Sequence, residues 1–157
     1  FVSDVERHLR RAGVPAAALC LELTESTIMS DARRALNTMR ELAELGVGLS
    51  IDDFGTGHSS LAYLKDLPVD EVKIDKSFVM AMGDRHNDPA IVRSIIYLAN
   101  ALDLSVVAEG VESEDLAAQL ARIGCGIAQG YHFARPLTEA AFTDWLLAHH
   151  RAPALIQ

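Results

Sequence analysis

The sequence has 157 residues, half of them hydrophobic, and a formal net charge of −8. A half-apolar chain of this length can bury a sizeable core, so we expect one globular domain and exclude a disordered acidic tail. No uncharged apolar run approaches the roughly 18 residues of a membrane span, and the acidic balance argues against binding to polymeric nucleic acid. A small phosphorylated ligand stays compatible with this charge if a metal ion supplies positive charge.

Strands and helices are predicted to alternate along the chain. Short apolar runs predict five strands, and the segments between them repeat apolar residues every three or four positions, as amphipathic helices do. Repeated strand–helix units imply a parallel sheet with right-handed crossovers. The strands are expected at residues 19–24, 47–52, 71–74, 105–109 and 127–133, and the helices around 32–43, 91–102, 116–123 and 142–146.

The cysteine content and the first residues favour an intracellular protein. Cys20 and Cys125 are too few for a disulfide framework and are typical of a reducing compartment. Charged side chains come early in the sequence, unlike the start of a secretory signal. We therefore expect a cytoplasmic location and no membrane contact from this segment.

Polar side chains interrupt the apolar strands near their carboxyl ends. Strands of a parallel sheet covered by helices are normally almost continuous apolar runs, and successive side chains point to opposite faces. If the apolar residues face the helices, the polar ones share the other face, near the mouth of a barrel, where α/β enzymes place active sites. One strand carboxylate is more often a structural ion-pair partner, but five recurrences at one depth indicate a functional site. The five are Glu22, Asp52, Lys73, Glu109 and Gln129.

Four carboxylates and one lysine are expected to face one cavity, and two of the carboxylates, Asp52 and Asp53, are adjacent in the sequence. Like charges held close together do not all stay ionised without compensation. Oxygen ligands favour Mg²⁺ or Mn²⁺ over zinc, and adjacent aspartates suit a two-metal arrangement in which one carboxylate bridges both ions. We therefore expect one or two divalent cations among these carboxylates, which are Glu22, Asp52, Asp53 and Glu109.

Five longer motifs carry these polar residues: LELTES at 21–26, IDDFGTGHSSL at 51–61, VDEVKIDKSFV at 69–79, VVAEGVES at 106–113 and QGYHFARPL at 129–137. Their order and spacing resemble the EAL-domain family of cyclic di-GMP phosphodiesterases. The resemblance extends from residue 19 to about residue 145, which makes it far more specific than one short motif. It implies a TIM-type (β/α) barrel and an enzyme that cleaves one phosphodiester bond of cyclic di-GMP, with Mg²⁺ or Mn²⁺, to give linear pGpG.

The resemblance also implies roles for single residues. Glu22, Asp52, Asp53 and Glu109 match metal ligands of the family. Lys73 matches a residue that contacts the attacking water or the phosphate. Glu109 is a candidate general base as well, and the sequence does not separate this role from metal binding.

Substrate contacts are expected from residues further along the chain. Glu112 and Gln129 match family positions that organise the catalytic site and the substrate. Arg135 and Pro136 could touch a guanine or a phosphate. A plain turn at the strand end is an equally good interpretation of this pair.

The loop after the second predicted strand is expected to be regulatory. Its glycines permit backbone angles closed to other residues and its hydroxyls can cap the next helix, although an ordinary strand–helix loop offers the same. The resemblance implies that this loop, together with Glu25, couples the site to the family's dimer interface. His58 departs from the tyrosine common at this point of the motif, which affects loop contacts. The expected regulatory set is Glu25, Phe54, Gly55, Thr56, Gly57, His58, Ser59 and Ser60.

The family's Glu-Ala-Leu segment and the asparagine-bearing strand that follows it do not occur in this sequence. We therefore expect residues 1–150 to be the C-terminal part of an EAL domain, a partial TIM-type barrel of about five βα units, with a tail at 151–157. An unclosed parallel sheet exposes strand edges, so a homodimer or a strand-borrowing oligomer is expected. The parent protein is expected to be an active phosphodiesterase, and the chain alone to be impaired or inactive.

Two other functions stay open at this stage. One is a non-catalytic cyclic di-GMP receptor, although degenerate members of that kind usually lose metal or lysine positions. All the visible positions are present here, which favours an enzyme. The other is an assembly module that acts through the loop and the dimer surface.

Overall fold

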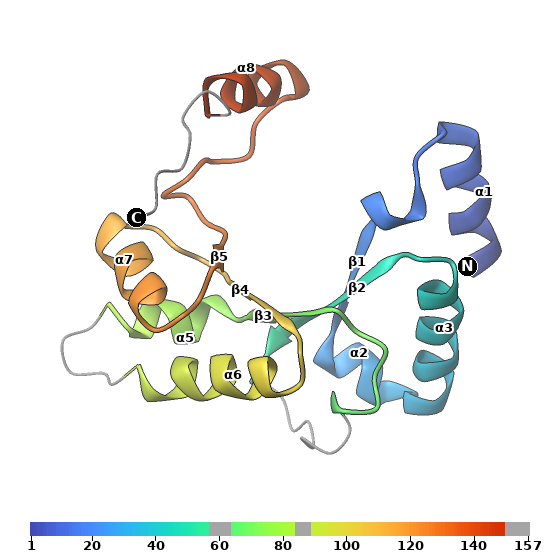
Figure 1. The fold of residues 1–157 in the computed structure, drawn as a ribbon, viewed down its shortest axis with the longest axis horizontal. Coiled ribbons are helices and arrows are strands. Elements are labelled where there is room, and N and C mark those ends of the chain that lie inside the picture. The colour runs from blue at the N-terminus through green and yellow to red at the C-terminus, as the bar shows by residue number, and fades with distance from the viewer. Residues whose placement is uncertain (57–63, 84–88, 150–157) are drawn as a thin grey trace.

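The computed structural model describes residues 1–56, 64–83 and 89–149. In this part of the chain, five parallel strands form one sheet in which each strand pairs with the next one along the sequence. The prediction of an α/β fold built from about five βα units is therefore confirmed (Figure 1). The strands are β1 Cys20–Thr24, β2 Gly48–Phe54, β3 Glu71–Ile74, β4 Ser105–Ala108 and β5 Ile127–Ala128.

Helices connect the strands, and Figure 1 shows α2, α3, α5 and α6 on the same side of the sheet. Short polar side chains begin several of them, since Thr24, Asp31, Asp75 and Ser113 each accept a hydrogen bond from a backbone N–H of the first turn. The described helices are α1 Val2–Ala12, the short 3₁₀-helix η1 Ala16–Ala18, α2 Glu25–Ser30, α3 Ala32–Glu44, α5 Lys76–Ala81, α6 Ala90–Ala101, α7 Glu114–Arg122 and α8 Glu139–His149.

The hydrophobic core lies between the sheet and these helices. The register pairs Leu21 with Leu49 and Ile51 with Val72, and Val72 in turn pairs with Val106. Leu49, Ile51 and Val72 are buried. Because side chains alternate along each strand, the polar positions between these residues are left on the opposite face of the sheet.

The fifth strand is shorter than predicted. A strand was expected over 127–133, but pairing with β4 is limited to Ile127–Ala128. The chain then turns, and the backbone N–H of His132 donates to the backbone carbonyl of Val111 at 3.0 Å. The end of the apolar run therefore packs against the residues after β4 instead of continuing the sheet.

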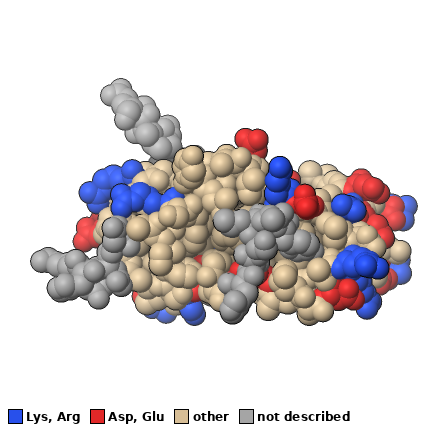
Figure 2. Space-filling view, turned by 90° about the horizontal axis from the view of Figure 1, so that it is seen from below, with Lys and Arg blue, Asp and Glu red and all other residues tan. Residues whose placement is uncertain are grey.

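The outer parts of the molecule are less closely packed. Neither α1 nor α8 has a buried residue, and Figure 1 shows α8 set apart from the sheet. On the face shown in Figure 2, acidic and basic side chains lie near one another toward both ends of the molecule. Among the described residues, no helix combines the length and the apolar character that crossing a bilayer requires.

Shortening a core side chain should destabilise this fold. Ile74 is 0 % exposed in β3, so Ile74→Ala removes buried apolar surface and leaves a cavity. We expect the free energy of unfolding, measured by urea denaturation, to fall by about 2–5 kcal/mol. Ile91 in α6 is 55 % exposed and provides the matched control, because Ile91→Ala should change that energy by less than about 0.5 kcal/mol. Equal losses in the two variants would contradict this description of the core.

Candidate active site

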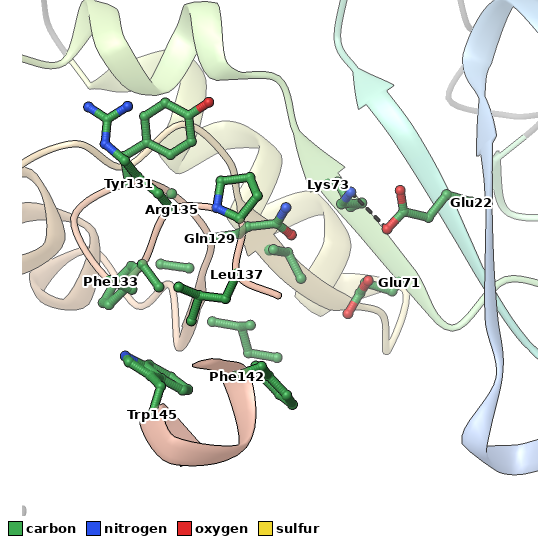
Figure 3. Close-up of a pocket in the computed structure, with 16 residues that line it drawn as sticks. Glu22, Glu71, Lys73, Gln129, Tyr131, Phe133, Arg135, Leu137, Phe142 and Trp145 are labelled. Carbon is green, nitrogen blue, oxygen red and sulfur yellow. Dashed lines mark ion pairs between the residues drawn. The ribbon is translucent and has the colours of Figure 1, made fainter. Parts of the chain in front are cut away.

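A buried lysine lies among three carboxylates at the carboxyl ends of the strands. The Nζ atom of Lys73 in β3 lies 2.6 Å from Glu109 Oε1, 2.8 Å from Glu22 Oε1 and 3.6 Å from Asp52 Oδ1. Glu22 comes from β1, Asp52 from β2, and Glu109 directly follows β4. The polar residues predicted to share one face of the sheet therefore do meet there, and Figure 3 shows the pair of Lys73 with Glu22.

The surroundings of Lys73 keep it positively charged. Burial lowers the pKa of its ammonium group, but hydrogen bonds to Glu109 and Glu22 outweigh burial and raise the pKa above its usual value. At neutral pH the side chain therefore donates hydrogen bonds and carries a proton. Lys73 is thus suited to stabilise negative charge and unsuited to act as a general base.

A cluster of three carboxylates lies beside the lysine. Asp52, Asp53 and Glu109 each offer one oxygen atom within 4.8 Å of the other two. Asp52 Oδ1 is buried and accepts no hydrogen bond from the described residues, since Lys73 Nζ lies beyond hydrogen-bond distance. A buried carboxylate oxygen in this state is costly unless a cation compensates it. The three carboxylates therefore fit a hard divalent cation. Glu22, the fourth predicted ligand, contacts Lys73 but is not one of the three.

Two consecutive aspartates reach one cluster because β2 is irregular. In a regular strand, Asp52 and Asp53 would point to opposite faces. The pairing of β2 with β3 shifts register between Ile51 and Phe54, and Asp53 has a φ of 55°, a region that costs energy for a residue other than glycine. Partial burial and the charge of Asp52 raise the pKa of Asp53, as expected for acids that are crowded together.

The loop that follows β2 is tied to α2. Glu25 is buried at the start of α2, and its Oε2 atom accepts a hydrogen bond from the backbone N–H of Gly55 at 3.4 Å. The Thr56 hydroxyl donates to the backbone carbonyl of Asp53 at 2.9 Å. Glu25 is therefore linked to the backbone that carries the carboxylate cluster, although its regulatory role stays a prediction. Of the predicted loop, Phe54, Gly55 and Thr56 are described, whereas Gly57, His58, Ser59 and Ser60 lie outside the described residues.

A cavity of about 620 Å³ extends from the lysine toward the residues after β5. Lys73 lines it together with three of the predicted substrate residues, Gln129, Arg135 and Pro136. Figure 3 shows Gln129 between Lys73 and the aromatic side chains further along the cavity. The structure therefore brings these substrate residues to one cavity, but it leaves Glu112 exposed and outside the residues that line it.

Sequence analysis missed an aspartate beside the carboxylate cluster. The side chain of Asp75 lies within hydrogen-bond reach of Asp53 and contributes to its raised pKa. Burial raises the pKa of Asp75 itself, but hydrogen bonds from Ser77 outweigh burial and lower it. The position of Asp75, directly after β3 and at the start of α5, was the signal that could have identified it.

Sequence analysis also missed several aromatic side chains that line the cavity. The guanidinium carbon of Arg135 lies 4.7 Å from the ring centroid of Tyr131, as in a cation–π contact. Trp145 and Phe142 of α8 line the same cavity. Their helix is separated in sequence from the strands, so nothing in the local pattern predicted that they would face the site.

The amino-acid sequence is similar to those of curated phosphodiesterases. It is 46% identical over 149 residues to the cyclic di-GMP phosphodiesterase NbdA of Pseudomonas aeruginosa, and this alignment covers 95% of the chain and 19% of NbdA. It is 40% identical over 145 residues to the cyclic di-GMP phosphodiesterase RocR of the same organism, with 92% of the chain and 37% of RocR covered. The chain therefore spans less than two fifths of these curated relatives.

Solved structures share the fold. The MucR phosphodiesterase of Pseudomonas aeruginosa in complex with c-di-GMP superposes with a TM-score of 0.85 at 45% identity, covering 90% of this chain and 57% of that chain. The EAL domain of Mycobacterium smegmatis DcpA gives a TM-score of 0.87 at 44% identity, with coverages of 97% and 68%. These likenesses confirm the predicted fold class. Because the model of the EAL domain also matches residues 1–136, the chain belongs to the EAL-domain family.

Proposed function

We propose that the protein containing this chain hydrolyses cyclic di-GMP to linear pGpG in a reaction that depends on Mg²⁺ or Mn²⁺. The observation that carries the proposal is the cluster of Asp52, Asp53 and Glu109, in which the buried Asp52 Oδ1 accepts no hydrogen bond from the described residues. The names of NbdA and RocR support the reaction. Structures of Klebsiella pneumoniae BlrP1, 31% identical to this chain, contain cyclic di-GMP with manganese or calcium, which supports a divalent metal.

The carboxylates would hold the metal. Asp52, Asp53 and Glu109 supply the oxygen ligands, and Glu22 adds a further carboxylate next to them through its contact with Lys73. A divalent cation bound there lowers the pKa of bound water and neutralises charge on the phosphate. Oxygen ligation of this kind suits Mg²⁺ and Mn²⁺.

Lys73 and Glu109 would act on the phosphate and the attacking water. The Lys73 ammonium, fixed by Glu22 and Glu109, donates a hydrogen bond to a phosphate oxygen or to the water. It stabilises the charge that develops as the phosphodiester bond breaks. The carboxylate of Glu109, 2.6 Å from the Lys73 ammonium, is the candidate that accepts the proton of the water.

The remaining predicted residues would orient the nucleotide. Gln129, Arg135 and Pro136 line the cavity that begins at Lys73, so a cyclic di-GMP whose phosphate lies at the lysine extends along them. Glu112 contacts the substrate from the exposed loop after β4. The contact of Glu25 with Gly55 gives the dimer-linked loop a route to the cluster through Asp53.

Removing the charge of Lys73 should stop the reaction. We expect Lys73→Met in the full-length protein to lower the rate of pGpG formation, followed by liquid chromatography, at least about 100-fold, because a donor to the developing charge is lost. Lys65 is exposed, and Lys65→Met should keep the wild-type rate. Thermal melting of both variants shows whether they fold. A Lys73→Met protein that keeps half of the rate would contradict the assignment, and metal-independent nucleotide binding without hydrolysis in the wild type would favour a receptor.

Loss of one carboxylate should weaken metal binding in the absence of any substrate. We expect Asp52→Asn to raise the dissociation constant for Mn²⁺ at least about tenfold, because Asp52 supplies one of the three carboxylates of the cluster. The free Mn²⁺ signal in electron paramagnetic resonance measures this. Asp66→Asn changes an exposed aspartate and should leave the constant unchanged. Equal Mn²⁺ affinity in the wild type and Asp52→Asn would place the metal elsewhere.

A further inference from the structure

The segment that carries Glu109 is joined to the segment that carries Gln129 by backbone hydrogen bonds. The N–H of Gln129 donates to the carbonyl of Ala108 at 2.8 Å, and the N–H of Val111 donates to the carbonyl of Gln129 at 3.1 Å. The N–H of His132 then donates to the carbonyl of Val111 at 3.0 Å. Residues 108–111 and 129–132 therefore form one connected unit beyond the ends of β4 and β5, which we call the 108–132 clamp.

Gly130 is the point of closest approach inside this clamp. A methyl group at Gly130 would place its carbon 2.1 Å from the backbone oxygen and 2.3 Å from the backbone nitrogen of Val111. A carbon and a carbonyl oxygen ordinarily stay about 3.3 Å apart, so any side chain here must push the Val111 backbone away by about 1 Å. The φ of Gly130 is not in the positive region that favours glycine, so space, not backbone angle, requires glycine at this position.

A displaced Val111 would move the residues next to it. Val111 is 0 % exposed and lies two residues after Glu109, whose carboxylate is 2.6 Å from Lys73 Nζ and belongs to the cluster with Asp52 and Asp53. Shifts of about 1 Å in a site of this kind can cost about 100-fold in function. A displacement of Val111 at Gly130 would therefore be transmitted to Glu109 through only two residues.

We propose that Gly130 is a positioning residue for the metal cluster. Because Gly130 has no side chain, the two segments of the 108–132 clamp can pack closely together. This packing, which we call clamp closure, places the Glu109 carboxylate next to Asp52, Asp53 and Lys73. The proposal rests on the metal-binding part of the proposed function and goes beyond it, since Gly130 has no side chain that could bind a metal or a nucleotide. Gly130 thus joins the functional residues because it allows two backbone segments to approach closely.

The chain offers a matched control for this position. Gly126 lies four residues earlier, before β5, and a methyl group there would have nothing within 4 Å. Val92 in α6 is 1 % exposed, so Val92→Ala lowers stability without touching the clamp. Gly126→Ala thus tests the glycine-to-alanine change itself, and Val92→Ala tests the effect of lost stability.

The experiment measures Mn²⁺ binding to the 157-residue chain by electron paramagnetic resonance, together with thermal melting. We expect Gly130→Ala to weaken Mn²⁺ binding at least tenfold, and Gly126→Ala and Val92→Ala to stay within twofold of the wild type. Equal affinities in Gly130→Ala and the wild type would overturn the proposal. So would equal losses in Gly130→Ala and Val92→Ala, or a wild-type chain without Mn²⁺ binding, which would have no cluster to position.

A measurement on the wild type covers the case in which Gly130→Ala does not fold. If clamp closure favours metal binding, metal binding must favour clamp closure by the same factor. Saturation with Mg²⁺ should therefore slow hydrogen exchange at the amides of Val111 and His132, and leave the amide of Val14 near α1 unchanged. Unchanged exchange at Val111 and His132 would overturn the proposal.

Hydrolysis assays separate this proposal from the proposed function. A full-length protein that binds Mn²⁺ through Gly130-dependent geometry but does not form pGpG would refute the phosphodiesterase and leave the positioning role intact. A protein that forms pGpG equally fast with Gly130→Ala, at unchanged Mn²⁺ affinity, would refute the positioning role alone.

Discussion

The structure depends on one buried ammonium group that is surrounded by acids. Lys73 would be costly to bury alone, and so would Glu109 and Asp52, but together they compensate each other. The compensation is incomplete, because three carboxylates face one lysine and Asp53 lies next to them. Excess negative charge of this kind favours a small, highly charged cation. Part of the −8 net charge of the chain is therefore carried by carboxylates inside the site, where we propose that it serves metal binding.

Regular secondary structure alone would not produce this arrangement. Alternation along β2 would send Asp52 and Asp53 to opposite faces, and the register shift together with the left-handed backbone of Asp53 brings them to one side. Bulges and strained residues cost stability and persist where the surrounding structure enforces them. Here the contact of Glu25 with Gly55 and the hydrogen bond of Thr56 to Asp53 supply that enforcement. These two hydrogen bonds thus help to hold the irregular end of β2 in place.

The sequence predicts those parts of the site that follow from the regular alternation of side chains along the strands. Glu22, Lys73 and Glu109 were predicted to share a face because parallel strands in register repeat the same alternation, and their ion pairs confirm it. Asp75 carries a sequence signal too, because it directly follows β3. The turn that cuts β5 short, in contrast, depends on contacts between segments far apart in the sequence. No local pattern encodes such contacts, and the apolar character of residues 127–133 pointed to a longer strand.

Residues that position a site differ in kind from residues that bind. A carboxylate or a lysine is noticed in a sequence because its chemistry is scarce inside apolar strands, whereas glycine is common in every turn. Yet the Glu109 segment meets close approaches on both sides: a carbon at Gly110 would lie 2.5 Å from Lys76 Cβ, and a carbon at Gly130 would lie 2.1 Å from the Val111 oxygen. Both contacts exclude a side chain. By the positioning role that we propose, the accuracy with which Glu109 faces Lys73 depends on two residues that have no side-chain chemistry of their own, and at Gly130 only the distances reveal this.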